Sequence, residues 1–368
     1  KLQTQAAALD LPRVFLAPLA FDRLDGVATW RRKAGAVELR LESLDFANPH
    51  ATGRATGTYR SAATGPGVID LSARLSDGDL TQAYRYLPRW IDSATRDWLR
   101  LGIKKGRATE ATLKLAGNLA DFPFADGKPG TFLVEGKTTG VVLDYADGWP
   151  PLTDLDAAVR FAGKGLVVEG RSARVYGAEV GGTRAEIPDL DAEFPRLAIA
   201  GDAAGPVADF LRFVEESPVA GWIGDVTDRA EGAGRGQLKL RLDLVLGSQG
   251  EDKVAGAFTF VDAQLRLRGV PLLANVNGVL EFTEADVRAR EIAVDVAGGP
   301  ARISVRNDAG RLRVDAAGSA SVAAVRREFT LPFDWIPAAR AVDAAVANGD
   351  AALLATCLRA LRRRLMVH

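Results

Sequence analysis

Paired carboxylates are the groups in this sequence whose spacing could support chemistry. The pairs are Asp77 and Asp79, Asp144 and Asp147, Asp154 and Asp156, and Asp189 and Asp191. Two carboxylates at such a spacing can act as general acid and base, or can bind calcium. Most of these pairs stand beside Gly or Pro, and Asp beside Gly is far more often a turn former. The pairs therefore predict turns, and neither a catalytic site nor a metal site.

Other catalytic side chains are scarce. The chain has two histidines, His50 and His368, and one cysteine, Cys357. A single cysteine excludes an internal disulfide framework and a multi-cysteine metal site. The chain also has no Gly-x-Ser-x-Gly elbow, no phosphate-binding Gly-x-x-x-x-Gly-Lys-Ser/Thr loop and no His-Glu-x-x-His run. We therefore expect a protein that is not an enzyme and that uses no cofactor and no metal.

Charge and composition narrow the choice of partners. The chain of 368 residues carries 47 Lys and Arg against 47 Asp and Glu, so it has no net charge that would attract nucleic acid. Hydrophobic residues make up 47% of the chain, which is enough for a sizeable core, and no uncharged apolar run is long enough for a membrane-spanning helix. The chain begins with Lys1 and shows no signal-peptide pattern, which favours an internal fragment of a longer protein.

Most of the sequence alternates apolar and charged residues with period two. The run Val37-Glu38-Leu39-Arg40-Leu41-Glu42 is typical, and in a strand it would give one aliphatic face and one solvated face. Turn signals between such runs are Asp77-Gly78, Asp126-Gly127, Asp147-Gly148 and Asn277-Gly278. The pattern predicts a mainly β protein built on a long, repetitive antiparallel sheet.

Two segments have helical periodicity instead. In residues 80–101, Ile91, Trp98 and Leu99 fall on one side of a helix, and in residues 206–226 Val207, Phe210 and Val214 do the same. We expect two amphipathic helical segments packed on the sheet. Trp90, Trp98 and Trp222 lie in these segments, where packing explains them best, whereas Trp149 sits in a Gly-Trp-Pro-Pro loop and has no assigned role.

Similar sequences recur along the chain. Residues 24–30, 155–161 and 276–282 resemble one another, and helical segments precede similar strands in two places. We infer a single segment over residues 1–333 with repeat units at about 1–80, 81–204 and 205–333. Residues 334–368 form an atypical Ala- and Arg-rich helical tail, which is either a cap for the sheet end or a product of an altered reading frame.

Several short motifs occur in order in the middle of the chain: Leu87-Pro88-Arg89, Trp98-Leu99, Gly106-Arg107-Ala108, Asp121-Phe122-Pro123-Phe124, Asp126-Gly127, Leu143-Asp144-Tyr145 and Gly148-Trp149-Pro150-Pro151-Leu152. Together they resemble the AsmA-like family, in particular its YhdP branch, over about residues 1–333. The resemblance implies a sheet curled into an apolar groove that passes phospholipid between the inner and outer membranes. It also implies a place in the periplasm or envelope of a Gram-negative bacterium. The family's inner-membrane anchor is absent from this chain, so membrane contact is expected through parts outside it.

The aliphatic face of each strand supplies the candidate lipid-binding residues of this groove. They are Leu39, Leu41, Leu113, Leu115, Leu240, Leu242, Leu244, Leu265, Leu267, Ile303, Val305, Leu312 and Val314. From the residues alone, a β-sandwich in which a second sheet covers this face is the commoner solution. Two functions stay open at this point: a segment that conducts lipid without catalysis, or a structural or adhesive β-scaffold of the envelope. An enzyme acting on polysaccharide has the least support.

Overall fold

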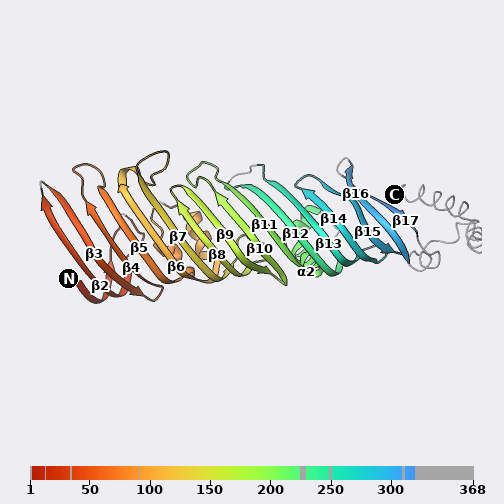
Figure 1. The fold of residues 1–368 in the computed structure, drawn as a ribbon, viewed down its shortest axis with the longest axis horizontal. Coiled ribbons are helices and arrows are strands. Elements are labelled where there is room, and N and C mark those ends of the chain that lie inside the picture. The colour runs from red at the N-terminus through yellow and green to blue at the C-terminus, as the bar shows by residue number, and fades with distance from the viewer. Residues whose placement is uncertain are drawn as a thin grey trace, which may run out of the picture.

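The computed structural model describes residues 2–319, apart from positions 13, 34, 90, 224–228, 248–250 and 309–310. Strands account for 65% of the described residues and form one antiparallel sheet of 17 strands that does not close into a barrel. Each strand pairs with the next one along the chain, so the sheet grows in sequence order from β1 to β17 (Figure 1). The prediction of a mainly β, antiparallel fold is confirmed.

Apart from β1 and β17, each strand is at least ten residues long. Their bounds are β1 Leu2–Leu9, β2 Leu19–Lys33, β3 Ala36–Asn48, β4 Ala51–Arg60, β5 Val68–Asp79, β6 Ile103–Asn118, β7 Gly130–Leu143, β8 Leu152–Ala162, β9 Gly165–Val175, β10 Ala178–Ile187, β11 Arg196–Pro206, β12 Glu231–Val245, β13 Lys253–Arg266, β14 Leu273–Thr283, β15 Val287–Val296, β16 Gly299–Asp308 and β17 Arg311–Gly318. Alternating sequence explains their formation, because each strand has an aliphatic side and a charged side.

Helices interrupt the meander in two places on one edge of the sheet, and the short 3-10 helix η2 (Leu119–Asp121) follows β6 at the opposite edge. The 3-10 helix η1 (Leu80–Tyr86) and α1 (Ser93–Gly102) connect β5 to β6, and α2 (Val207–Glu215) and α3 (Val219–Ile223) connect β11 to β12. Figure 1 shows these helices behind the sheet, toward its lower edge. The two predicted helical segments are therefore confirmed. We call this edge the helical rim, and the opposite edge, where β2 turns into β3 and β8 into β9, the hairpin rim.

Most strand pairs contain a β-bulge, usually in the half of the strand nearer the helical rim. A residue with positive φ lies at eight of these register shifts: Gly106, Gly140, Asp154, Gly182, Gly234, Asp262, Asn275 and Gly278. Gly, Asp and Asn adopt this conformation most readily. Bulges bend a strand and increase its twist. The bulges therefore recur where the strands approach the helical rim, and they bend the individual strands there.

Two of the predicted turns lie inside strands. Asn277-Gly278 falls within β14, where the Asn277 Oδ1 atom accepts a hydrogen bond from the Asp262 backbone N–H at 3.0 Å. This bond spans the bulge between β13 and β14, so the Asn-Gly pair serves a bulge and the turn prediction was wrong. Asp77-Gly78 likewise lies within β5. The pairs 126–127 and 147–148 do lie in turns, as predicted.

The buried core is small and lies toward the helical rim. Its main cluster contains Val207 of α2 with Leu265, Leu273, Val276 and Ile292 of the sheet. Every described strand belongs to the single sheet, and no second sheet covers its aliphatic side in the part of the chain described. The β-sandwich alternative is therefore wrong for these residues.

The three similar segments of the sequence occupy β2, β8 and β14, which are six strands apart. The helices that follow β5 and β11 are also six strands apart. The exact repeat boundaries stay a prediction. The predicted tail at 334–368 lies outside the described residues.

Candidate functional site

Aliphatic residues of neighbouring strands face one another across the whole sheet. Directly opposed residues of antiparallel strands lie on the same face, so the pairing register identifies the rows. One row is Leu41, Gly57, Leu71, Leu115 and Phe132; another is Leu113, Val134, Phe161, Leu166 and Ile187; a third is Ile199, Leu242 and Val254. We call the surface that these rows form the apolar face.

All but one of the predicted lining residues lie within strands of this sheet. They are Leu39 and Leu41 in β3, Leu113 and Leu115 in β6, Leu240, Leu242 and Leu244 in β12, Leu265 in β13, Ile303 and Val305 in β16, and Leu312 and Val314 in β17. Leu267 follows the end of β13 and lies in the loop toward β14. Within each strand the named residues are two apart and share a face. Their contact with lipid stays a prediction.

Exposure on the apolar face differs between an open stretch of the hairpin rim, at β2 and β3, and the helical rim at β13 and β14. Trp30, which is opposite Leu39, is 76% exposed, and Leu39 itself is 38% exposed. At the other end of the strands, Leu265 is 9% exposed and Val276 is 1% exposed. The predicted residues thus divide into an open group and a covered group, and Leu265 serves the core.

Helix α2 covers the apolar face at β12 and β13. Val207, in the first turn of α2, is 1% exposed and shares the core cluster with Leu265. The Phe210 ring of α2 meets Phe258 of β13 edge-on, with centroids 5.0 Å apart. Gly232 makes this approach possible, because a Cβ there would lie 2.7 Å from a Val207 methyl group. Apolar packing therefore attaches this helix to the sheet.

Aromatic rings lie over glycines on the same face. Phe46 rests on Gly53, Phe258 on Gly236, and Phe282 on Gly256. Phe46 and Gly53 are directly opposed across two strands, as are Phe282 and Gly256. A side chain at any of these glycines would lift the ring away from the sheet. Glycine at these positions therefore allows each ring to pack directly against the backbone of the neighbouring strand.

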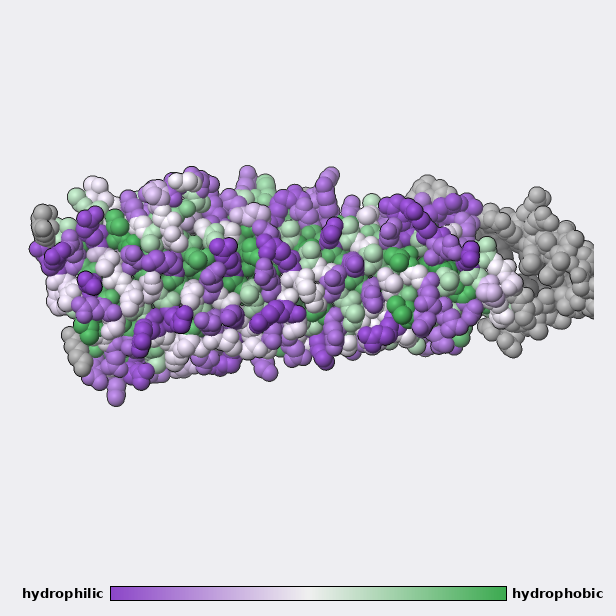
Figure 2. Space-filling model, in the orientation of Figure 1, coloured by the Kyte–Doolittle hydropathy of each residue, from purple (hydrophilic) through white to green (hydrophobic). Residues whose placement is uncertain are grey.

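The opposite face of the sheet is charged. Cross-strand ion pairs recur on it, including Arg160 with Glu135 at 3.2 Å, Arg184 with Glu169 at 2.9 Å and Arg196 with Asp243 at 2.9 Å. Figure 2 shows hydrophilic residues spread over the full length of the face turned toward the viewer, with smaller apolar areas between them. Water can solvate this face without help from a partner.

The paired carboxylates have structural partners. Asp156 Oδ1 accepts hydrogen bonds from Thr139 Oγ1 at 2.7 Å and from the Gly140 N–H at 3.0 Å, and these bonds hold the pKa of Asp156 below its usual value. Asp77 pairs with Arg107 and Asp144 with Lys104. Asp189 accepts from the Asp191 N–H at 2.8 Å in a loop. These groups stabilise bulges, strands and loops.

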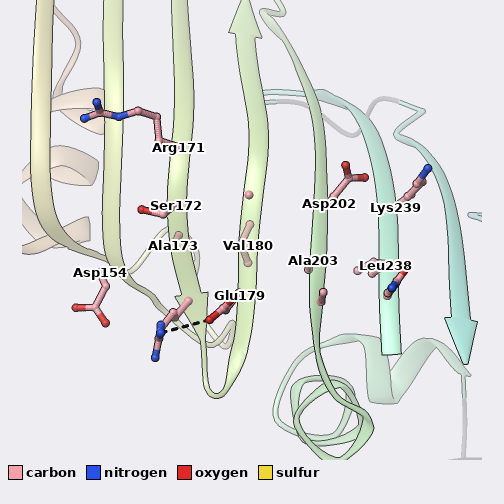
Figure 3. Close-up of a pocket in the computed structure, with 14 residues that line it drawn as sticks. Asp154, Arg171, Ser172, Ala173, Glu179, Val180, Asp202, Ala203, Leu238 and Lys239 are labelled. Carbon is pink, nitrogen blue, oxygen red and sulfur yellow. Dashed lines mark hydrogen bonds and ion pairs between the residues drawn. The ribbon is translucent and has the colours of Figure 1, made fainter. Parts of the chain in front are cut away.

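A shallow depression over β8 to β12 gathers charged side chains without forming a catalytic arrangement (Figure 3). Arg171, Asp202 and Lys239 lie along it, and Arg174 pairs with Glu179 at 3.4 Å. None of its residues is a Cys or a His. Among the residues that the structure describes, no cluster of three or more His, Cys, Asp or Glu side chains could hold a metal ion.

The sheet thus has a continuous apolar face and a charged opposite face. Comparison with known proteins shows which family has a sequence like that of this chain. The model of the YhdP protein family matches residues 1–346. The chain belongs to the YhdP family. The intermembrane phospholipid transporter YhdP of Escherichia coli K12 is 27% identical over 291 residues, which are 78% of this chain. This YhdP-family chain spans 22% of that relative's length. No solved structure matches the chain.

Sequence reasoning missed several features of this YhdP-family site. The loop between β6 and β7 folds Phe124 onto Gly117 and Gly130, and Phe124 is only 9% exposed there. The Asp121-Phe122-Pro123-Phe124 motif belongs to this loop, but nothing in its spacing indicates the direction in which it folds. Within the described residues, no helix is long and apolar enough to cross a membrane.

Proposed function

We propose that this chain is a non-catalytic segment of a Gram-negative envelope protein that conducts phospholipid acyl chains between the inner and outer membranes along its apolar face. The observation that carries the proposal is the set of aliphatic rows that cross the sheet and remain partly open to water. The E. coli relative, which is described as an intermembrane phospholipid transporter, supports the choice of lipid.

An open aliphatic surface of this length calls for an apolar occupant. Apolar surface in water costs about 25 cal/mol per Å², and large exposed apolar patches usually mark binding sites. Acyl chains fit this surface because apolar contact has no directional requirement, so that a chain can slide from one row to the next. Ile303 and Val305 pack against the core cluster. The open lining group, whose members are half-buried or exposed, comprises Leu39, Leu41, Leu113, Leu115, Leu240, Leu242, Leu244 and Val314.

The bent sheet gives this surface the form of a groove in our proposal. Bulges recur near the helical rim, and α1 and α2 approach the sheet from the same rim. Bending toward the helices would shelter acyl chains on one side while the charged face stays in water. No step of this function requires a nucleophile, a base or a bound metal.

Two variants on β12 test the proposal. Leu242 is half-buried on the apolar face opposite Ile199 and Val254, whereas Gln237 is exposed opposite Ala204 and Thr259. Leu242→Asp and Gln237→Asp both add one negative charge to the same strand. A carboxylate among acyl chains is strongly unfavourable, so Leu242→Asp should reduce bound phospholipid severalfold and Gln237→Asp should not.

Phospholipid that copurifies with each full chain is measured by mass spectrometry, together with the melting temperature. We expect lipid loss in Leu242→Asp at a nearly unchanged melting temperature, because an open surface leaves the carboxylate in reach of water. If the wild-type chain carries no lipid and Leu242→Asp unfolds, the scaffold function replaces lipid conduction.

A further inference from the structure

The two long rims of the sheet differ in what covers the apolar face beside them. At the helical rim, Ala157, Val207, Ala263 and Val276 are at most 1% exposed. At the hairpin rim, Trp30 is 76% and its cross-strand partner Leu39 is 38% exposed, whereas Ile187 farther along the same rim is 7% exposed. An acyl chain near the helical rim would thus meet packed side chains, whereas near the hairpin rim of β2 and β3 it would meet water.

One contact that holds α2 in place comes from the loop between β7 and β8. The ring of Trp149 lies 5.8 Å from Phe213 of α2 and 6.2 Å from Tyr145, centroid to centroid. The Trp98 Nε1–H of α1 donates to the Tyr145 backbone carbonyl at 3.0 Å. This aromatic series connects α1 to α2 and gives Trp149 of the Gly-Trp-Pro-Pro loop a role.

A second contact comes from the turn between β9 and β10. The Tyr176 hydroxyl donates to Glu216 Oε2 at 2.6 Å, and Arg212 Nε donates to Glu216 Oε1 at 2.8 Å. The Arg212 guanidinium also lies over the Tyr176 ring, 3.9 Å from its centroid. Two strand connections from the preceding part of the sheet therefore hold α2 in addition to its packing on β12 and β13.

Several connections at the hairpin rim are only two or three residues long. Residues 163–164 join β8 to β9, and residues 284–286 join β14 to β15. The loop between β6 and β7, residues 119–129, is longer, and its Phe124 packs on the apolar face over Gly117 and Gly130. Away from that loop, the structure has no helix at this rim among the residues it describes.

From this asymmetry we infer that phospholipid lies across the apolar face with its headgroup at the hairpin rim and its acyl chains directed toward the helical rim. The inference rests on the proposed function. A charged phosphate loses much of its solvation if it is buried without partners, so it must stay where the face is open. The acyl ends find the covered side that α1 and α2 form. Trp149 and Tyr176 act as positioning residues for that cover.

Strand β12 provides four regularly spaced positions at which labelling can be compared. Leu238, Leu240, Leu242 and Leu244 alternate along it from the helical rim toward the hairpin rim, at about 6.6 Å per step. Two phosphatidylethanolamine probes carry a photoreactive diazirine, one in the headgroup and one at the end of an acyl chain. Each is incubated with the full chain from vesicles of that lipid, and the labelled residues are mapped by mass spectrometry.

We expect the headgroup probe to label near Leu244 and the acyl-end probe to label near Leu238 and on α2, with an enrichment of at least about threefold in each direction. In the double variant Trp149→Ala, Tyr176→Phe, the acyl-end labelling should spread away from α2. Trp149→Phe, which keeps a ring, should restore the wild-type pattern.

The outcomes test the lipid orientation separately from the proposed function on which it rests. If both probes label the apolar face but the headgroup probe favours Leu238 or α2, or if both label β12 evenly, the orientation is wrong while lipid conduction stands. If neither probe labels the apolar face, the proposed function itself fails and the orientation falls with it.

Discussion

The ring of Phe46 lies against Gly53, its cross-strand partner, so closely that a Cβ atom at position 53 would stand 2.5 Å from a ring carbon. Gly53→Ala should therefore force the ring off the sheet and lower the free energy of unfolding by about 1–3 kcal/mol. Gly136→Ala is the matched control, because its Cβ would meet no atom closer than 3.5 Å. There the loss of glycine flexibility should raise stability by about 0.5–1 kcal/mol. Equal effects in urea denaturation would contradict the close approach of Phe46.

Leu265 and Leu39 were predicted to have the same role, and the structure separates them. Leu265 is 9% exposed in the core cluster with Val207, and Leu39 is 38% exposed. Leu265→Ala should cost about 2–5 kcal/mol of stability, since it leaves a cavity. Leu39→Ala should cost less than about 1 kcal/mol. Thermal unfolding of both variants measures the difference, and a larger loss for Leu39→Ala would show that the hairpin rim is covered.

Asp92 caps the first turn of α1. Its carboxylate accepts from Thr95 Oγ1 at 2.7 Å and from the Thr95 N–H at 2.8 Å, and these bonds lower the pKa of Asp92. Asp92→Ala should cost about 1 kcal/mol, and Asp92→Asn much less. Because the folded-state pKa is lowered, this contribution is present above the ordinary pKa of an aspartate and is lost as the pH falls through the folded value. An acid melting series that treats wild type and Asp92→Ala alike would disprove the cap.

Tyr176 should titrate unusually late. Burial, and then its hydrogen bond to Glu216, raise the pKa of Tyr176 from 10.0 to about 12. A raised folded-state pKa means that the stabilisation is complete below pH 10 and is lost as the pH rises from 10 to about 12. In a pH titration followed by phenolate absorbance, the Tyr176→Phe variant should therefore lack one group that titrates near pH 12 in the wild type. Loss of a group that titrates near pH 10 would mean that Tyr176 is free of Glu216.

The sequence predicts the strands and helices well because their periods are physically distinct. Residues 80–101 and 206–226 are predicted to be helical, and η1, α1, α2 and α3 lie there, with α1 extending one residue further to Gly102. The alternating run at 37–42 lies within β3. A period of two places side chains on alternate sides of a strand, so the aliphatic face follows directly from the pattern.

Neither the bulges nor the segments that cover parts of the apolar face could be predicted in the same way. Asn277-Gly278 has the composition of a turn, and only the pairing of β13 with β14 makes it part of a bulge. Phe124 reaches Gly117 and Gly130, and Tyr176 reaches Glu216, through contacts between segments distant in sequence. Such contacts depend on register and bending, which local composition does not specify.

The most direct test of lipid conduction is site-specific photo-crosslinking from the protein side. A photoreactive phenylalanine analogue is placed at Leu41, Leu115 or Leu242 on the apolar face, and at Lys114 or Gln237 on the charged face of the same sheet. After irradiation in cells, each full chain is purified and its adducts are identified by mass spectrometry. Lipid conduction predicts phospholipid adducts at all three apolar positions and none at the two charged-face positions. Adducts absent from the apolar positions, or equally frequent on both faces, would contradict it.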